Sequence, residues 1–136
     1  MPQPTSSPPR LGYVIIYVPH VGSAVEFYER AFGLVRKFVH ESGQYAEFET
    51  GATILAFSDE TDVPTREFIE PNRASKKAAA VEIALTVQDV AAAFAKAVAA
   101  GAEAIVHPIQ KPWGQTISYV RDSNGVLVEL CSAVSV

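Results

Sequence analysis

Two glutamates interrupt otherwise apolar segments in the second half of the chain. Glu82 lies in Val-Glu-Ile-Ala-Leu (81–85), and Glu129 lies in Val-Leu-Val-Glu-Leu (126–130). If both side chains face one cleft, the two carboxylates are neighbours in a low dielectric and cannot both stay ionised without compensation. A divalent metal ion with waters, a basic group of a ligand, a nearby Arg or Lys, or one raised pKa could supply it. The competing interpretation is that each glutamate faces solvent on the outer side of an antiparallel sheet.

The two glutamates fall in the second of two similar parts of the chain. Each part, residues 11–57 and 80–131, contains a predicted strand, an amphipathic helix that ends at a glycine, and three more strands. The two glycines, Gly33 and Gly101, are 68 residues apart (101 − 33). The repeat predicts two βαβββ modules in tandem, joined by a linker over residues 58–79. Two copies of one unit generally pack around a shared cleft.

Local signals predict the elements of each module. The predicted strands cover residues 13–18, 35–40, 44–50 and 52–57 in the first module and residues 81–87, 104–108, 115–121 and 126–131 in the second. Ser23 is expected to cap the first helix and Asp89 the second, because both side chains can accept hydrogen bonds from N–H groups of a first helical turn. Within the linker, residues 66–69 could form a short helical turn.

The composition limits the classes of function. A chain of 136 residues that is 49% hydrophobic and 19% charged can bury one ordinary core, which predicts a single globular domain over residues 11–136. The net charge of −4 and the absence of a basic run argue against binding to nucleic acid. No apolar run approaches the roughly 20 residues that cross a membrane. We therefore expect neither nucleic acid nor membrane as a partner.

The ends of the chain and its single cysteine give two further expectations. Residues 1–10 are rich in proline and serine and lack the apolar segment of a signal peptide, so they are expected to form a flexible arm. Because Cys131 is the only cysteine of the sequence, an intramolecular disulfide cannot form. A reducing cytoplasmic location is the natural expectation for such a chain.

The paired βαβββ pattern and two of its segments resemble the vicinal oxygen chelate superfamily. That superfamily includes glyoxalase I, extradiol dioxygenases, fosfomycin-resistance enzymes and bleomycin-resistance proteins. The two segments are the helix AVEFYERAFGL of the first module and the ending SYVRDSNGVLVEL of the second. The resemblance runs from Leu11 to Cys131 and implies the glyoxalase/bleomycin-resistance/dioxygenase fold, an α+β fold in which curved mixed sheets form a cleft. This fold hosts many chemistries, so it does not fix one reaction.

The resemblance also implies where a metal would bind. In metal-using members the ligands project inward from the first and last strands of each module, which selects Tyr13, Leu55, Glu82 and Glu129. Leucine offers no lone pair and a neutral tyrosine is a poor ligand, so the usual site is incomplete in the first module. Glu82 and Glu129 remain candidate catalytic residues and candidate ligands of a divalent ion such as Zn, Ni, Mn or Fe. The resemblance favours an inward orientation for both.

Aromatic residues are the other candidates for ligand contact. A proline-tryptophan-glycine loop, here within residues 111–115, commonly lines the cleft of members of this superfamily. Trp113 would then form an aromatic wall, with Gln115 as a neighbouring polar group. The alternative is that Trp113 plugs the end of its barrel-like half. The strand residues that could add to the lining are Tyr13, Tyr17, Phe48, Phe57 and Tyr119.

Two functional classes follow. One is a binding protein of the bleomycin-resistance kind, which binds a small molecule between the modules without a complete metal site and favours cationic ligands. The other is a lyase, isomerase or dioxygenase of the glyoxalase type, in which Glu82 and Glu129 hold a divalent ion that polarises vicinal oxygens of the substrate. No histidine matches a ligand position, although His40 or His107 could reach the cleft as a base. A homodimer is expected in either class, since exposed strand edges invite pairing.

Overall fold

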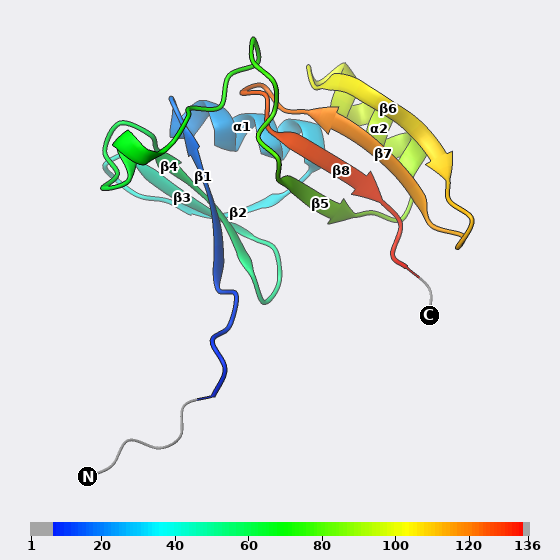
Figure 1. The fold of residues 1–136 in the computed structure, drawn as a ribbon, viewed down its shortest axis with the longest axis horizontal. Helices are drawn as coiled ribbons and strands as arrows, with labels where there is room; N and C mark the ends of the chain where they lie inside the picture. The colour runs from blue at the N-terminus through cyan, green and yellow to red at the C-terminus, as the bar shows by residue number, and fades with distance from the viewer. Residues whose placement is uncertain (1–6, 135–136) are drawn as a thin grey trace.

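The computed structural model describes residues 7–134. The chain forms two four-stranded mixed sheets, each with one helix, in the predicted tandem βαβββ order (Figure 1). Part of the predicted arm, residues 1–6, lies outside the described residues, as do residues 135 and 136. Residues 7–10 are exposed and have no regular secondary structure.

The first module forms one sheet with strand order β1-β4-β3-β2. Its elements are β1 (Tyr13–Val18), α1 (Val21–Phe32), β2 (Val35–Val39), β3 (Tyr45–Glu49) and β4 (Ile54–Asp59). Strand β1 runs parallel to β4, and the other neighbours are antiparallel. The crossover through α1 makes that parallel pairing possible, because parallel neighbours need a long connection.

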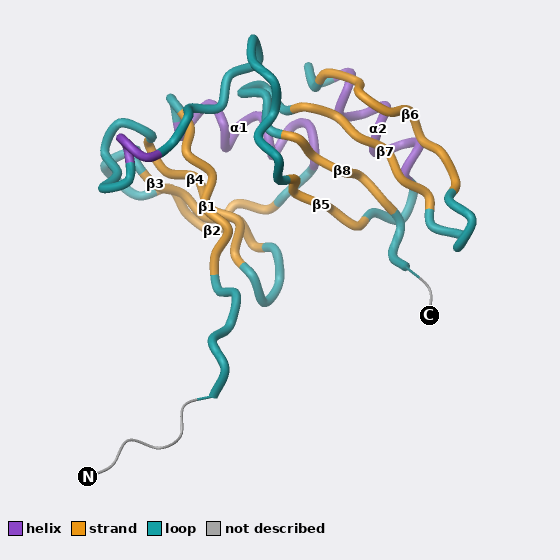
Figure 2. The backbone as a smooth tube through the Cα atoms, viewed as in Figure 1, coloured by secondary structure: helices purple, strands orange, loops and turns teal. Residues whose placement is uncertain are grey.

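The second module repeats this topology with strand order β5-β8-β7-β6. Its elements are β5 (Glu82–Thr86), α2 (Val90–Ala99), β6 (Glu103–Gln110), β7 (Thr116–Arg121) and β8 (Leu127–Cys131). The linker between the modules is mainly loop (Figure 2). The helical turn predicted within it is a 3-10 helix, η1 (Arg66–Phe68). The predicted duplication is therefore confirmed.

The helix ends agree with the predicted caps, with one correction. Gly33 ends α1 in the left-handed conformation (φ 68°), and the Asp89 side chain accepts a hydrogen bond of 3.0 Å from the Ala92 N–H at the start of α2. Ser23 is not the cap of α1, because the helix begins at Val21. The Val21 side chain is buried in the core, so its packing outweighs the capping preference of serine.

The two helices pack against each other and share one core. Helix α1 contacts β2, β3 and β4, α2 contacts β6, β7 and β8, and the helices contact each other. Side chains alternate along a strand, so Ile16 and Val18 of β1 face this core while Tyr13 and Ile15 lie on the opposite face. Each sheet therefore has one face on the helices and one open face.

No helix among residues 7–134 has both the length and the apolar character needed to cross a membrane.

Candidate functional site

Glu82 and Glu129 lie on the open face of the second sheet. Glu82 begins β5, and Ala84, two residues further on, pairs with Glu129 of the parallel strand β8. Tyr119 of β7 pairs with Glu129 from the other side. Alternate residues share a face of a strand, and the buried neighbours Val128 and Leu130 face α2. The strand register thus gathers two carboxyl groups and a phenol in one cluster.

The electrostatics of this cluster show that the carboxyl groups interact. The pKa of Glu82 is raised above its ordinary value, first by partial burial and then by a hydrogen bond with Glu129 and the negative charge of Glu129. The pKa of the Tyr119 phenol is also raised, first by desolvation and then by the charges of Glu129 and Glu82. A proton shared between two carboxyl groups relieves like-charge repulsion, so the pair favours one bound proton or a bound cation.

No basic side chain neutralises the pair within the part of the chain that the structure describes. None of the ion pairs in residues 7–134 includes Glu82 or Glu129. Arg121 lies two residues along β7 from Tyr119, but its guanidinium donates to backbone carbonyls of the linker and of Gly125. The charge of the cluster therefore remains available to a ligand.

Two pockets lie side by side in the groove between the modules, and Glu82 lines both. The first pocket has a volume of about 460 Å³ and lies between β5 and the β4 side of the first module. Its wall in the first module includes Phe32, Thr53 and Leu55, and its wall in the second module includes Glu82 and Leu85. The predicted ligand contact Leu55 thus lines the same pocket as Glu82.

The second pocket, of about 280 Å³, lies between β1, the linker and the first residues of β5 and β8. Its lining is mainly apolar, with Val14, Ile16 and Leu127 beside the hydroxyl-bearing Tyr17. The Tyr17 hydroxyl accepts a hydrogen bond of 3.0 Å from Thr65 of the linker. A small apolar group with a polar end therefore matches the lining of this pocket.

The structure corrects two of the predicted aromatic contacts. Phe48 and Phe57 are fully buried, and both rings pack against Tyr28 of α1, with centroid separations of 6.3 Å and 4.8 Å. They face the helix because they occupy the same side of the sheet as the core residues Val14 and Ile16. Both residues stabilise the core and line neither pocket.

The strand register also corrects Leu55 as one of the four family ligand positions. Tyr13 is the first residue of β1, and Glu82 is the first residue of β5. Two residues further along each strand, Ile15 pairs with Ala56 in the first module, and Ala84 pairs with Glu129 in the second. Ala56, and not Leu55, is therefore the counterpart of Glu129. A shift of one residue along a strand moves a side chain to the other face, which is why Leu55 lies on the core side.

Glu129 and Tyr119 line neither pocket, although both are neighbours of Glu82 on the open face, and the remaining predicted residues also lie outside the two pockets. Tyr13 is 54% exposed on the open face of the first sheet, close enough to Tyr45 to affect its pKa. Trp113 is 55% exposed in the turn between β6 and β7, and its indole N–H donates to Gln115 Oε1 at 3.0 Å. Gln115 in turn donates to the Ser132 carbonyl at 3.0 Å. Neither His40, which bonds Ser42, nor His107, which packs on Phe94, lines a pocket.

The donor set does not fit a resident divalent metal. The four family positions hold two carboxylates, an exposed tyrosine and an alanine. No three His, Cys, Asp or Glu side chains come together as a metal site in residues 7–134. Metal ions that bind imidazole and carboxylate ligands need three or more protein donors to be held tightly, and the cluster supplies two carboxylates.

The sequence did not reveal the contribution of the linker to the site. Ile69, Glu70, Pro71 and Asn72 line the second pocket, although residues 58–79 were expected only to connect the modules. These residues show no periodicity that would indicate a buried face. Their position depends on side-chain contacts with distant parts of the chain, which no local pattern encodes.

Comparisons with known proteins agree with this architecture. The family model described as Glyoxalase/Bleomycin resistance protein/Dioxygenase superfamily matches residues 10–130. A glyoxalase/bleomycin resistance protein/dioxygenase family enzyme from Burkholderia phytofirmans PsJN has a TM-score of 0.77 at 19% identity, covering 92% of this chain and 98% of that one. A glyoxalase-related enzyme from Fulvimarina pelagi has a TM-score of 0.74 at 17% identity, covering 91% and 88%. TioX from Micromonospora sp. ML1 has a TM-score of 0.71 at 23% identity, covering 91% and 98%. No curated protein matches the sequence.

Proposed function

Because the chain belongs to the glyoxalase/bleomycin resistance protein/dioxygenase superfamily, we propose that it binds a small cationic molecule in the groove between its two modules. The proposal depends on the surroundings of Glu82. This residue lines both pockets, interacts with Glu129, and has no basic partner among the described residues. A ligand cation supplies the missing charge, so the chain acts as a binding protein of the bleomycin-resistance kind.

The lining of the groove favours a ligand with two chemically different parts. A protonated amine or aromatic cation lies near Glu82 and Glu129, where it competes with the proton that the pair favours. An apolar part fills the second pocket against Val14, Ile16 and Leu127. Apolar burial supplies affinity, and the placed charges fix the orientation of the ligand.

We further propose that the chain forms a homodimer through the open face of the first sheet. Strands β1 and β5 each have one edge without a strand partner in residues 7–134. Tyr13 and Ile15 are 54% and 45% exposed on β1, and Phe38 of β2 lies on the same sheet at 38%. Apolar side chains beside an open strand edge favour association with a second copy. Sedimentation velocity should show a dimer, and Ile15→Glu should shift it towards monomer.

Binding of two related dyes tests the ligand proposal. Proflavine is a planar aromatic cation at neutral pH, and acridine is its largely uncharged parent ring. We expect proflavine to bind more tightly than acridine, as measured by the fluorescence anisotropy of each dye. Glu82→Gln should weaken proflavine binding about tenfold, which corresponds to about 1.4 kcal/mol. Acridine binding should change little, because this substitution removes a charge and keeps the size.

The control variant is Glu41→Gln, which makes the same change in an exposed turn between β2 and β3. It should leave the affinity for proflavine within experimental error of the unmodified protein. Equal losses in Glu41→Gln and Glu82→Gln would mean that only net charge matters, and the proposed site would be wrong. Equal affinity for the two dyes would contradict a cation site.

A further inference from the structure

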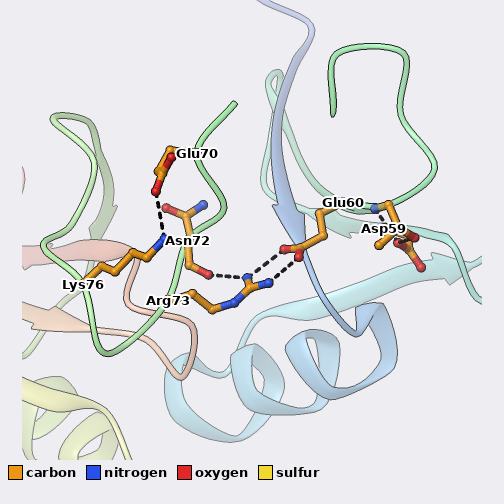
Figure 3. A network of polar contacts seen from close by, with 7 residues as sticks. Asp59, Glu60, Glu70, Asn72, Arg73 and Lys76 are labelled. Atoms are coloured by element: carbon orange, nitrogen blue, oxygen red, sulfur yellow. Dashed lines mark hydrogen bonds and ion pairs between the residues drawn. The ribbon is translucent and has the colours of Figure 1, made fainter. Parts of the chain in front are cut away.

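One wall of the second pocket is a short segment of the linker. This segment, residues 69–76, will be called the strap. Ile69, Glu70, Pro71 and Asn72 line the pocket opposite β1, and the rest of the strap leads towards β5. Since the strap contains no helix or strand, side-chain contacts must hold it in place. Figure 3 shows these contacts around Arg73.

The first contact ties the strap to the first module. Arg73 donates two hydrogen bonds to Glu60, at 2.9 Å to Oε1 and 2.5 Å to Oε2 (Figure 3). Glu60 follows β4 and is 8% exposed, and its pKa is lowered chiefly by the hydrogen bonds from Arg73. The pair is bidentate, which fixes the orientation of the guanidinium as well as its position.

The second contact ties the same residue to the second module. Arg121 at the end of β7 donates to the Lys76 carbonyl at 2.5 Å and to the Arg73 carbonyl at 3.3 Å. Its Nε also donates to the Gly125 carbonyl at 2.9 Å, which holds the guanidinium against the turn between β7 and β8. Arg73 is thus bound through its side chain by one module and through its backbone by the other.

We infer that Arg73 is a positioning residue that holds the strap against β1 and so sets the size of the second pocket. The inference rests on the proposed function for the identity of the ligand. The wall itself is defined by the contacts of Arg73 with Glu60 and Arg121, so its test needs no ligand. Loss of the Glu60–Arg73 pair releases the strap from the first module, and the second pocket opens while the first pocket is unchanged.

Thiol labelling measures this opening directly. In a Cys131→Ser background, which removes the buried native thiol, Leu127→Cys places a probe in the second pocket and Leu85→Cys places a matched probe in the first. Both leucines are half-buried. The rate of reaction with a maleimide is then compared in proteins with and without Arg73→Gln or Glu60→Gln. Thermal unfolding shows that each variant is folded.

We expect Arg73→Gln and Glu60→Gln each to raise the labelling rate at Leu127→Cys about fivefold. The rate at Leu85→Cys should not change, and Arg73→Lys, which keeps the charge, should give an intermediate rate at Leu127→Cys. A purely structural role of the pair would loosen the whole fold and raise both rates together, which would overturn the inference. An unchanged rate at Leu127→Cys would overturn it as well. Failure of proflavine to bind the unmodified protein would contradict the proposed function and leave these rates unaffected.

Discussion

The Tyr28 hydroxyl donates a hydrogen bond of 2.5 Å to Asp122 Oδ2, joining α1 of the first module to the turn after β7 of the second. Both residues are buried. The other carboxylate oxygen of Asp122 accepts hydrogen bonds of 2.8 Å from the N–H groups of Asn124 and Val126. One carboxyl group therefore shapes the β7–β8 turn and fixes that turn to α1. This hydrogen bond therefore links the two modules that flank the groove.

Tyr28→Phe is expected to lower the free energy of unfolding by about 1–3 kcal/mol, because it leaves a buried oxygen of Asp122 without its partner. Urea denaturation measures the loss. Tyr45→Phe is a useful comparison, because the Tyr45 hydroxyl also donates to a carboxylate, that of Glu47, within one module. A smaller loss in Tyr28→Phe than in Tyr45→Phe would contradict the assigned importance of the contact between modules.

Gly125→Ala should destabilise the protein more than Gly43→Ala. Both glycines have positive φ, 87° and 74°, so both substitutions cost backbone strain. A Cβ at residue 125 would also meet the Arg73 carbonyl oxygen at 2.6 Å, whereas nothing lies within 4 Å of a Cβ at residue 43. We expect a difference of about 1–3 kcal/mol between the two variants in chemical denaturation. Equal losses would mean that the strap does not pack against this turn.

Glu82→Gln should stabilise the fold at neutral pH while it weakens ligand binding. The folded-state pKa of Glu82 is raised above its ordinary value, so its contribution to stability is present at acid pH and is lost as pH rises through the folded pKa. Removing the carboxylate abolishes that loss. Since Glu82 is exposed to solvent, the gain should stay below about 1 kcal/mol. A thermal-unfolding series should show the gain at neutral pH and its disappearance in acid. A fixed difference at all pH values would contradict the coupling with Glu129.

Zinc or manganese should bind weakly to the purified protein, because the cluster of Glu82 and Glu129 offers two carboxylates and, within residues 7–134, no third protein donor of the usual kinds. Isothermal titration with each metal ion measures the affinity. Tight binding of one metal ion per chain that is lost in both Glu82→Gln and Glu129→Gln would support the metal-dependent alternative instead.

The sequence predicts the fold because the signals for it are local. Alternating apolar strands, helices that end at glycine and the repeated order of elements each depend on residues close together in the chain. The same signals do not say which face of a strand meets the helix. From the sequence alone, Phe48 and Phe57 fit either face of the sheet. In the structure both face α1, where their rings pack against Tyr28.

The same distinction between local and long-range information applies to the candidate site. The strand pattern alone left the orientation of Glu82 and Glu129 open, and the family resemblance selected them as a pair, which the strand register brings together. The prediction placed Leu55 at the ligand position that Ala56 occupies, an error of one residue. Only the observed strand pairing corrects it, because the sequence does not fix the register. The strap could not be predicted, because Arg73 meets Glu60 and Arg121 through contacts that span 13 and 48 residues of the chain.

The pKa of Glu82 with and without a bound cation tests the account most directly. Carbon NMR of labelled glutamate carboxyl groups gives this pKa in the free protein and in the presence of saturating proflavine. We expect Glu82 to titrate above the ordinary range of glutamate in the free protein and at lower pH in the complex, because a nearby cation favours the ionised form. An unchanged titration of Glu82 on proflavine binding would contradict a cation site at this residue.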